Sequence, residues 1–171
     1  MTLTLVLIRH AKSSWDAPFS EDHARVLNTR GRAAAPVMGR WIAEKGYCPD
    51  QVLCSDAART FETLALMLPE WPIRPQVLTL SPLYHASPTG MIDQLRKATG
   101  QTVALVGHNP GIGSLACGLL PTRPAHPRYA DYPTCATAII AFKTTEWSKI
   151  GAGQGTLVDF AIPADLMGRN D

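Results

Sequence analysis

Apolar runs of strand length alternate with longer stretches of helical periodicity, and this alternation restricts the chain to a few folds. Strands are expected at residues 3–8, 51–54, 76–79 and 102–106. Helices are expected at about residues 30–45, 57–68, 88–98 and 111–120. The first run is almost entirely Leu, Val and Ile, which suits a strand buried on both faces. The order predicts an α/β fold, a three-layer sandwich with a mostly parallel central sheet.

Local signals mark where the expected helices begin and how the chain ends. The caps expected at the helix N-termini are Asn28 or Thr29, Ser55, Ser87 with Pro88, and Asn109 with Pro110. Residues 121–134 hold several prolines and are expected to form a long surface loop. Two late strands, at about 136–143 and 156–161, are expected to pair as a hairpin around the Gly-rich turn at 151–155.

Length and charge narrow the class of protein. A chain of 171 residues favours one domain, here residues 1–171. Lys and Arg number 16 and Asp and Glu 14, so the net charge is only +2. This balance gives no case for a nucleic-acid or membrane partner. Any anion binding must therefore come from the local placement of arginines.

Other features of the sequence favour a cytoplasmic protein without a metal or cofactor. The N-terminal apolar run stops at Arg9, too early for a signal peptide or a membrane span. The four cysteines form no CxxC pair and are expected to be free thiols in a reducing compartment. The five histidines include no HxH or HxxxH pair and no carboxylate cluster accompanies them, so no metal site is expected.

Charged and imidazole side chains follow three of the expected strands. Arg9 and His10 follow the first strand, and His108 follows the fourth. Arg59 lies about one turn into the helix after the second strand. In an open parallel sheet, ligands bind outside the carboxyl ends of the strands. The sequence therefore predicts one site at which these four residues converge.

The chemistry of this set suits phosphate. Arginine forks match phosphate oxygens, and the helix that follows Asn109 offers free backbone N–H groups. One imidazole can attack phosphorus and become a phosphohistidine, while the second stabilises the charge on the transferring group. The set therefore predicts a site that binds phosphate and accepts a phosphoryl group on histidine.

Several motifs resemble the histidine phosphatase superfamily, the phosphoglycerate mutase-like group. Residues 9–11 resemble its RHG signature with alanine in place of glycine, and residues 107–109 match its second-histidine motif. The remaining resemblances are in residues 12–16, 27–31 and 55–60, which are similar to its ExxWN-like, LTxxG and SxxxRT segments. Residues 83–87 and 134–138 resemble the short SixA-like phosphohistidine phosphatases, which lack a capping insertion.

The resemblance implies a role for each matched residue. It makes His10 the nucleophile, and Arg9, Arg59 and His108 the other catalytic residues. All four are expected to bind the phosphate, and the backbone N–H of Asn109 is expected to face it as well. No cofactor is expected.

Two positions depart from the family pattern. Many members carry a glutamate after the third strand as general acid, where this chain has Tyr84 and His85. Asp16 stands where many members have asparagine, so either His85 or Asp16 could supply a proton instead. An alcohol, with a pKa of about 16, needs a proton donor more than an imidazole leaving group, with a pKa of about 6.5. The missing glutamate therefore favours phosphohistidine as the substrate.

The sequence thus predicts an enzyme, a cofactor-independent phosphatase that acts on phosphohistidine in a signalling protein of the histidine phosphotransfer type. One alternative is a phosphomonoesterase that hydrolyses a small phosphate ester. Another is a non-catalytic module that binds phosphate or a phosphoprotein. The four-residue pocket argues against the module, while the missing glutamate keeps that alternative open.

Overall fold

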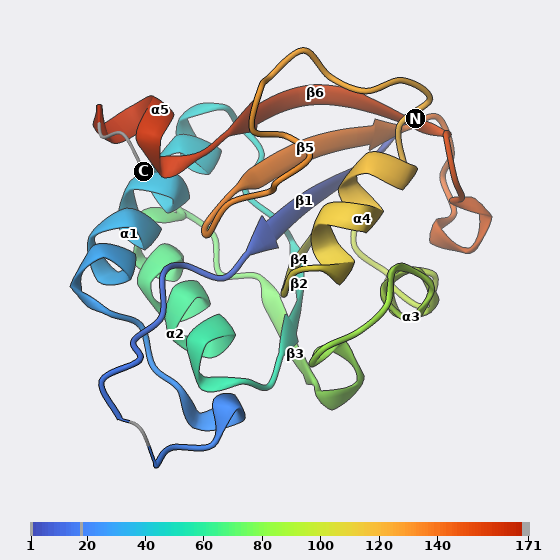
Figure 1. Cartoon of the computed structure of the whole chain (residues 1–171). Coiled ribbons are helices and arrows are strands. Elements are labelled where there is room, and N and C mark those ends of the chain that lie inside the picture. Colours follow the sequence, from blue (N-terminus) through green and yellow to red (C-terminus); the bar gives the residue numbers. More distant parts are fainter. Residues whose placement is uncertain (1, 18, 169–171) are drawn as a thin grey trace.

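A six-stranded sheet forms the centre of the computed structural model, which describes residues 2–17 and 19–168 (Figure 1). The strand order is β3-β2-β4-β1-β5-β6. The strands are β1 (Leu3–Arg9), β2 (Gln51–Ser55), β3 (Gln76–Leu80), β4 (Thr102–Gly107), β5 (Thr137–Phe142) and β6 (Gly155–Ala161). The first four strands run parallel, and β5 and β6 pair antiparallel at the other side of β1. The predicted α/β class with a mostly parallel sheet is confirmed.

Helices cover both faces of this sheet. They are α1 (Thr29–Glu44), α2 (Ala58–Met67), α3 (Pro88–Leu95), α4 (Gly111–Gly118) and α5 (Pro163–Met167). Figure 1 shows α1 and α2 on one side of the sheet and α3 and α4 on the other. No helix within the described part of the chain is long and apolar enough to cross a membrane.

Strand β1 is buried on both faces because its side chains alternate between two hydrophobic cores. Leu5 and Leu7 belong to the core under α3 and α4, whereas Val6 and Ile8 belong to the core under α1 and α2. All four side chains are fully buried. This burial anchors the end of β1 rigidly, and Arg9 and His10 emerge from it.

The predicted capping residues have different roles from one helix to the next. Asn28 and Ser87 cap α1 and α3, as each side chain accepts a hydrogen bond from a backbone N–H in the first turn. Ser55 does not cap α2, whose N-cap position is Ala57. The Asn109 side chain accepts from the N–H of Gly113 inside α4. The Ser55 hydroxyl is therefore available for the site described below.

The late hairpin forms as expected, but the connection between its strands is more structured than a turn. A short 3-10 helix, Trp147–Lys149, lies between β5 and β6. The Trp147 indole is buried, and its N–H donates to the Gly100 carbonyl at 2.6 Å. The connection is thus pinned to the loop before β4, a long-range contact that local sequence does not encode.

Candidate active site

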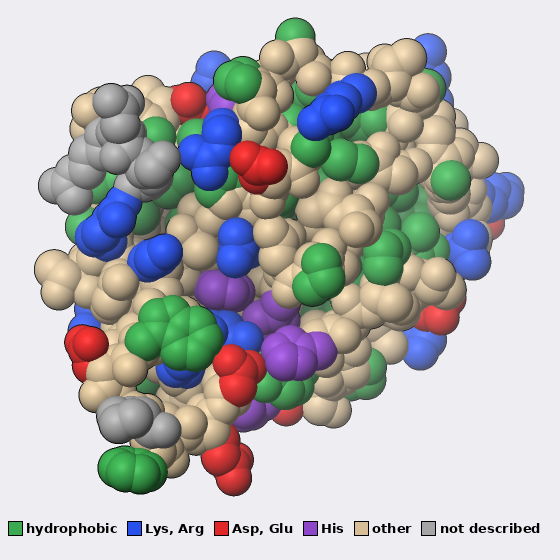
Figure 2. Space-filling view, viewed as in Figure 1, with side chains coloured by type: hydrophobic (Ala, Val, Ile, Leu, Met, Phe, Trp, Pro, Cys, Tyr) green, Lys and Arg blue, Asp and Glu red, His purple; other side chains and the backbone are tan. Residues whose placement is uncertain are grey.

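The ends of β1 and β4 and the first turn of α2 bring the predicted residues together. The rings of His10 and His108 have centroids 5.3 Å apart. His10, Arg59 and His108 are 5%, 3% and 2% exposed, a degree of burial that is rare for polar side chains. Figure 2 shows histidine side chains gathered at the surface, with Lys and Arg side chains beside them. The convergence at one edge of the sheet agrees with the predicted site.

His10 is held as a neutral imidazole with one free nitrogen. Its Nδ1 lies 2.7 Å from the backbone carbonyl of Ala11, which only an N–H can donate to. The hydrogen bond therefore leaves the lone pair on Nε2. Burial, together with the charges of Arg9, Arg59 and Arg25, lowers the pKa of His10 to about 3, against the opposing effect of the Ala11 bond. A neutral ring with a free Nε2 is the form that can attack phosphorus.

His108 is held in the opposite tautomer. Its Nε2 lies 2.8 Å from the Ser55 hydroxyl, which also accepts from the N–H of Ala57 at 3.4 Å. Among the described residues, Nε2 is the acceptor in reach of this buried hydroxyl proton, so we assign the ring hydrogen to Nδ1. Burial, followed by the proximity of His10 and Arg59, lowers the pKa of His108 to about 3. His108 is thus a neutral ring that presents an N–H donor.

Three buried N–H donors in this cluster have no partner among residues 2–17 and 19–168. They are Arg9 Nε, Arg59 Nε and His108 Nδ1. A buried donor left unpaired costs about 1–3 kcal/mol. One tetrahedral anion carries enough acceptor oxygens to pair with several donors at once. The site is therefore built for an oxyanion such as phosphate.

Comparisons with known proteins identify the family. The model of the histidine phosphatase superfamily (branch 1) matches residues 5–79. An uncharacterized protein of Mycobacterium tuberculosis is 30% identical over 163 residues, which cover 91% of this chain and 99% of the relative. The chain belongs to the histidine phosphatase superfamily.

Solved structures narrow the subgroup of this histidine phosphatase. SixA of Agrobacterium tumefaciens superimposes with a TM-score of 0.78 at 25% identity, over 94% of this chain and 98% of that one. SixA of Nakamurella multipartitia gives a TM-score of 0.79 at 26% identity, over 95% and 97% of the two chains. The predicted SixA-like subgroup and the predicted enzyme class, a phosphatase, are confirmed.

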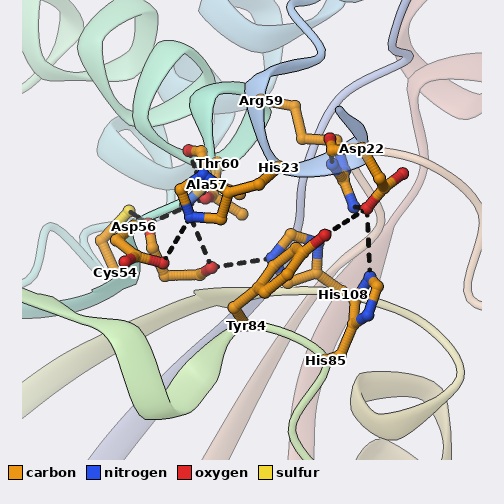
Figure 3. Close-up of polar contacts among 11 residues, drawn as sticks. Asp22, His23, Cys54, Asp56, Ala57, Arg59, Thr60, Tyr84, His85 and His108 are labelled. Atoms are coloured by element: carbon orange, nitrogen blue, oxygen red, sulfur yellow. Dashed lines mark hydrogen bonds and ion pairs between the residues drawn. The ribbon is translucent and has the colours of Figure 1, made fainter. Parts of the chain in front are cut away.

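A carboxylate that the sequence analysis missed completes the site of this histidine phosphatase. Asp22 lies in the short 3-10 helix Asp22–Ala24, between β1 and α1. Its Oδ2 accepts from the Tyr84 hydroxyl and from Arg59 Nη2 at 3.1 Å, and it lies 3.3 Å from His85 Nε2 (Figure 3). The Tyr84 bond, followed by the charges of Arg59 and Arg25, lowers the pKa of Asp22 to about 2. Asp22 is therefore ionised and ties Arg59 to the segment after β3.

The two expected proton donors lie in different environments. The His85 ring stacks on Tyr84 at 4.0 Å and lies 5.8 Å from the His108 ring. Its backbone has a φ of 52°, in the left-handed region that non-glycine residues rarely adopt. Asp16 is exposed, and no contact joins its side chain to the cluster within the described segments. The structure thus places His85, and not Asp16, beside the phosphate site.

Asn109 braces the site through its side chain. The amide donates to the carbonyls of Asp131 and Tyr132 at 3.0 and 3.2 Å, and its oxygen accepts from Gly113. Arg9 Nη1 donates to the same Tyr132 carbonyl at 3.1 Å. The amide side chain is therefore occupied, so only the backbone N–H of Asn109 could meet an anion, as the sequence analysis expected.

His23 is a further neighbour of the site. Its side chain is partly exposed, its Nε2 contacts Asp56 Oδ1 at 2.9 Å, and its ring forms a T-shaped contact with that of Tyr84. No group of three His, Cys, Asp or Glu side chains within the described residues is placed to hold a metal ion.

Proposed function

We propose that this phosphatase forms a covalent phosphohistidine on His10, without a cofactor, and removes phosphate from phosphohistidine in a protein of the histidine phosphotransfer type. The observation that carries the proposal is the neutral His10 beside three buried N–H donors that have no partner in the described part of the chain. The SixA structures support the choice of substrate, because their names describe them as candidate phosphohistidine phosphatases.

The reaction would proceed in two displacements. Arg9, Arg59 and the Nδ1–H of His108 bind the phosphoryl oxygens, and Nε2 of His10 attacks phosphorus opposite the leaving group. The new N–P bond forms as the bond to the leaving nitrogen breaks. Water then attacks the phosphorus, releases inorganic phosphate and restores the free Nε2 of His10.

The identity of the leaving group follows from the acids available. An imidazole has a pKa of about 6.5 and leaves with little help, whereas an alcohol, with a pKa of about 16, needs a proton. The carboxylate of Asp22 beside the pocket is ionised, already accepts from Arg59 and Tyr84, and contacts His85. A site without a protonated carboxyl group supports an N–P substrate over an ester.

One observation favours a second candidate function, hydrolysis of small phosphate esters. His85 lies beside the pocket, and its Nε2 is held by Asp22. A protonated His85 would be a proton donor for an alkoxide. The two functions differ in their need for this residue.

A comparison of wild type and His10→Ala tests both functions. Each protein is assayed on a phosphohistidine protein and on an aryl phosphate, with and without EDTA. The assays use substrate labelled in the phosphoryl group, and the enzyme that has accepted the label is trapped under alkaline conditions. We expect wild type to turn over the phosphohistidine protein and to carry label, and His10→Ala to do neither. Turnover of the aryl ester alone would support the second function. Absence of turnover on both substrates would refute both, and loss of activity in EDTA would refute cofactor independence.

A further inference from the structure

A third arginine, Arg25, lies beside the catalytic cluster, directly after the 3-10 helix Asp22–Ala24. Its side chain is only 12% exposed, and its Nη2 lies 3.5 Å from Oδ1 of Asp22. The other oxygen of this carboxylate, Oδ2, accepts from Arg59. Burial is the main cause of the lowered pKa of His10, and the charge of Arg25 is among the further causes. Arg25 is therefore within electrostatic reach of the nucleophile.

The backbone pairing between the segments before and after this 3-10 helix sets the position of Arg25. Ser13 pairs with Leu27 in an antiparallel bridge. Two residues further along each segment, the same register places Trp15 opposite Arg25. The guanidinium carbon of Arg25 lies 3.5 Å from the centroid of the Trp15 ring. The stack of the two side chains therefore follows from the pairing of their segments.

Trp15 covers the guanidinium from the side of the solvent. The indole is 74% exposed, whereas the other three tryptophans of the chain are buried. Figure 2 shows hydrophobic side chains lying against Lys and Arg side chains beside the histidines on this face. An aromatic face attracts a guanidinium group and restricts its orientation. The exposed Trp15 therefore shields Arg25 from water and fixes the plane of its fork.

Most of the hydrogen-bonding capacity of Arg25 remains open. Its Nε and Nη1 carry more than half of the N–H groups of the guanidinium. Both nitrogens are buried, and neither has a hydrogen-bond partner within residues 2–17 and 19–168. The contact with Asp22 is made by Nη2. Because buried donors without partners destabilise a folded protein, these open donors indicate a ligand that supplies oxygen atoms.

A phosphoryl group supplies such oxygens. During phosphoryl transfer, negative charge is spread over the equatorial oxygens of the transferring group. Arg9, Arg59 and His108 already offer one buried open donor each. Arg25 adds donors from the connection between β1 and α1, a segment that contributes none of the other three residues.

We propose that Arg25 donates to the oxygens of the transferring phosphoryl group and that Trp15 is the positioning residue that holds its fork in place. The inference rests on the proposed function, because it assigns two further residues to the same site. Nη2 of Arg25 stays near the Asp22 carboxylate, while Nε and Nη1 bind the anion.

The test uses variants that separate binding by Arg25 from positioning by Trp15. Arg25→Gln removes the guanidinium, and Arg25→Lys keeps the charge without the fork. Trp15→Ala removes the stack, and Trp15→Phe keeps an aromatic face. Arg40→Gln is the control for the loss of an arginine, since Arg40 is exposed and pairs with Glu70. Phe19→Ala is the control for the loss of an aromatic side chain, since Phe19 is a fully exposed residue of the same connection.

Titration calorimetry with inorganic phosphate measures binding without turnover. We expect Arg25→Gln to weaken phosphate binding about tenfold or more, because charge-assisted hydrogen bonds are lost, and Arg25→Lys to lie between that variant and wild type. Trp15→Ala should weaken binding about threefold, Trp15→Phe should restore it, and both controls should bind as wild type does. Melting temperatures without phosphate show which variants are folded.

Unchanged phosphate affinity in a folded Arg25→Gln variant would overturn the inference, and so would the absence of phosphate binding by wild type. If Arg25→Gln does not fold, unchanged affinity in Arg25→Lys has the same meaning. Unchanged affinity in a folded Trp15→Ala variant would overturn the role of Trp15.

Steady-state kinetics on the phosphohistidine protein distinguish this inference from the proposed function. Arg25→Gln should lower kcat about 10²-fold, because it removes a donor to the developing negative charge. Trp15→Ala should lower kcat less, and Trp15→Phe should rescue it. If wild type turns over no substrate, the proposed function fails, while the phosphate titration still decides on Arg25. Turnover by wild type with an equal kcat in Arg25→Gln would overturn the inference and leave the proposed function intact.

Discussion

Replacement of Ser55 by alanine is the sharpest test of how the site is organised. Ser55 is fully buried, and its hydroxyl lies between the N–H of Ala57 and Nε2 of His108. This hydroxyl is the group that directs the His108 hydrogen to Nδ1. We therefore expect Ser55→Ala to release the tautomer of His108 without altering any residue that contacts the phosphoryl group.

The size of the effect follows from what each His108 tautomer presents to the substrate. With the hydrogen on Nδ1, the ring donates to a phosphoryl oxygen. With the hydrogen on Nε2, it presents a lone pair to that oxygen instead. Loss of one donor to a developing negative charge costs about 10²–10³-fold in kcat. The structural cost is smaller, about 1–2 kcal/mol in the free energy of unfolding, because one buried hydrogen-bonding hydroxyl is lost.

Two measurements separate positioning from a purely structural role. Rapid-quench kinetics report the rate of phosphoryl transfer to His10, and NMR of the imidazole nitrogens reports the tautomer of His108. Ser114→Ala, on the exposed side of α4, is the control for removal of a hydroxyl. A folded Ser55→Ala variant with kcat within about twofold of wild type and an unchanged His108 tautomer would refute the reasoning.

Two further predictions concern the stability of the protein. Burial lowers the pKa values of His10 and His108 to about 3, below the unfolded value of about 6.5, so the unfolded chain binds more protons between these values. The free energy of unfolding should therefore be at its full value above pH 6.5 and fall by several kcal/mol toward pH 3, as urea titrations would show; a constant value across this range would contradict the burial argument. Gly31→Ala should lower the free energy of unfolding by about 2 kcal/mol, because the new methyl group meets the Lys12 carbonyl. Gly118→Ala is the control, since a methyl group at this position points into open space and should not destabilise the protein. Equal melting temperatures of the two variants would contradict this prediction.

The fold was largely predictable because the amino-acid composition of its central strands is almost entirely apolar. A run such as β1, with almost no polar residue, can only be buried on both faces, so helices must cover both sides. The buried Trp147 was not predictable in the same way. Its contact with Gly100 depends on how the β5–β6 connection folds back, which no local periodicity encodes.

The same distinction applies to the site. His10 and His108 follow buried parallel strands, and topology alone places the ends of such strands side by side. Asp22 lies in a short 3-10 helix within the long connection from β1 to α1, and the path of this connection depends on distant contacts, such as the bond from the N–H of Leu27 to Glu62 at 2.9 Å. Sequence spacing cannot place such a residue. Its polar character in a Pro-containing loop was the only signal, and many surface residues share it.

The position of Asp22 makes His85 the candidate proton donor in place of the missing glutamate. Asp22 holds Nε2 of His85 at 3.3 Å, and the His85 ring lies 5.8 Å from that of His108. If His85 donates the proton to a leaving oxygen, His85→Gln should slow the hydrolysis of an alkyl phosphate by about 10²-fold or more. Hydrolysis of a phosphohistidine should change little, because imidazole leaves without strong acid help. The measurement is the ratio of kcat on the alkyl phosphate to kcat on the phosphohistidine, compared between wild type and variant. Asp16→Asn is the control, since Asp16 is exposed and lies outside the cluster. An equal loss on both substrates would show that His85 shapes the pocket and does not donate the proton.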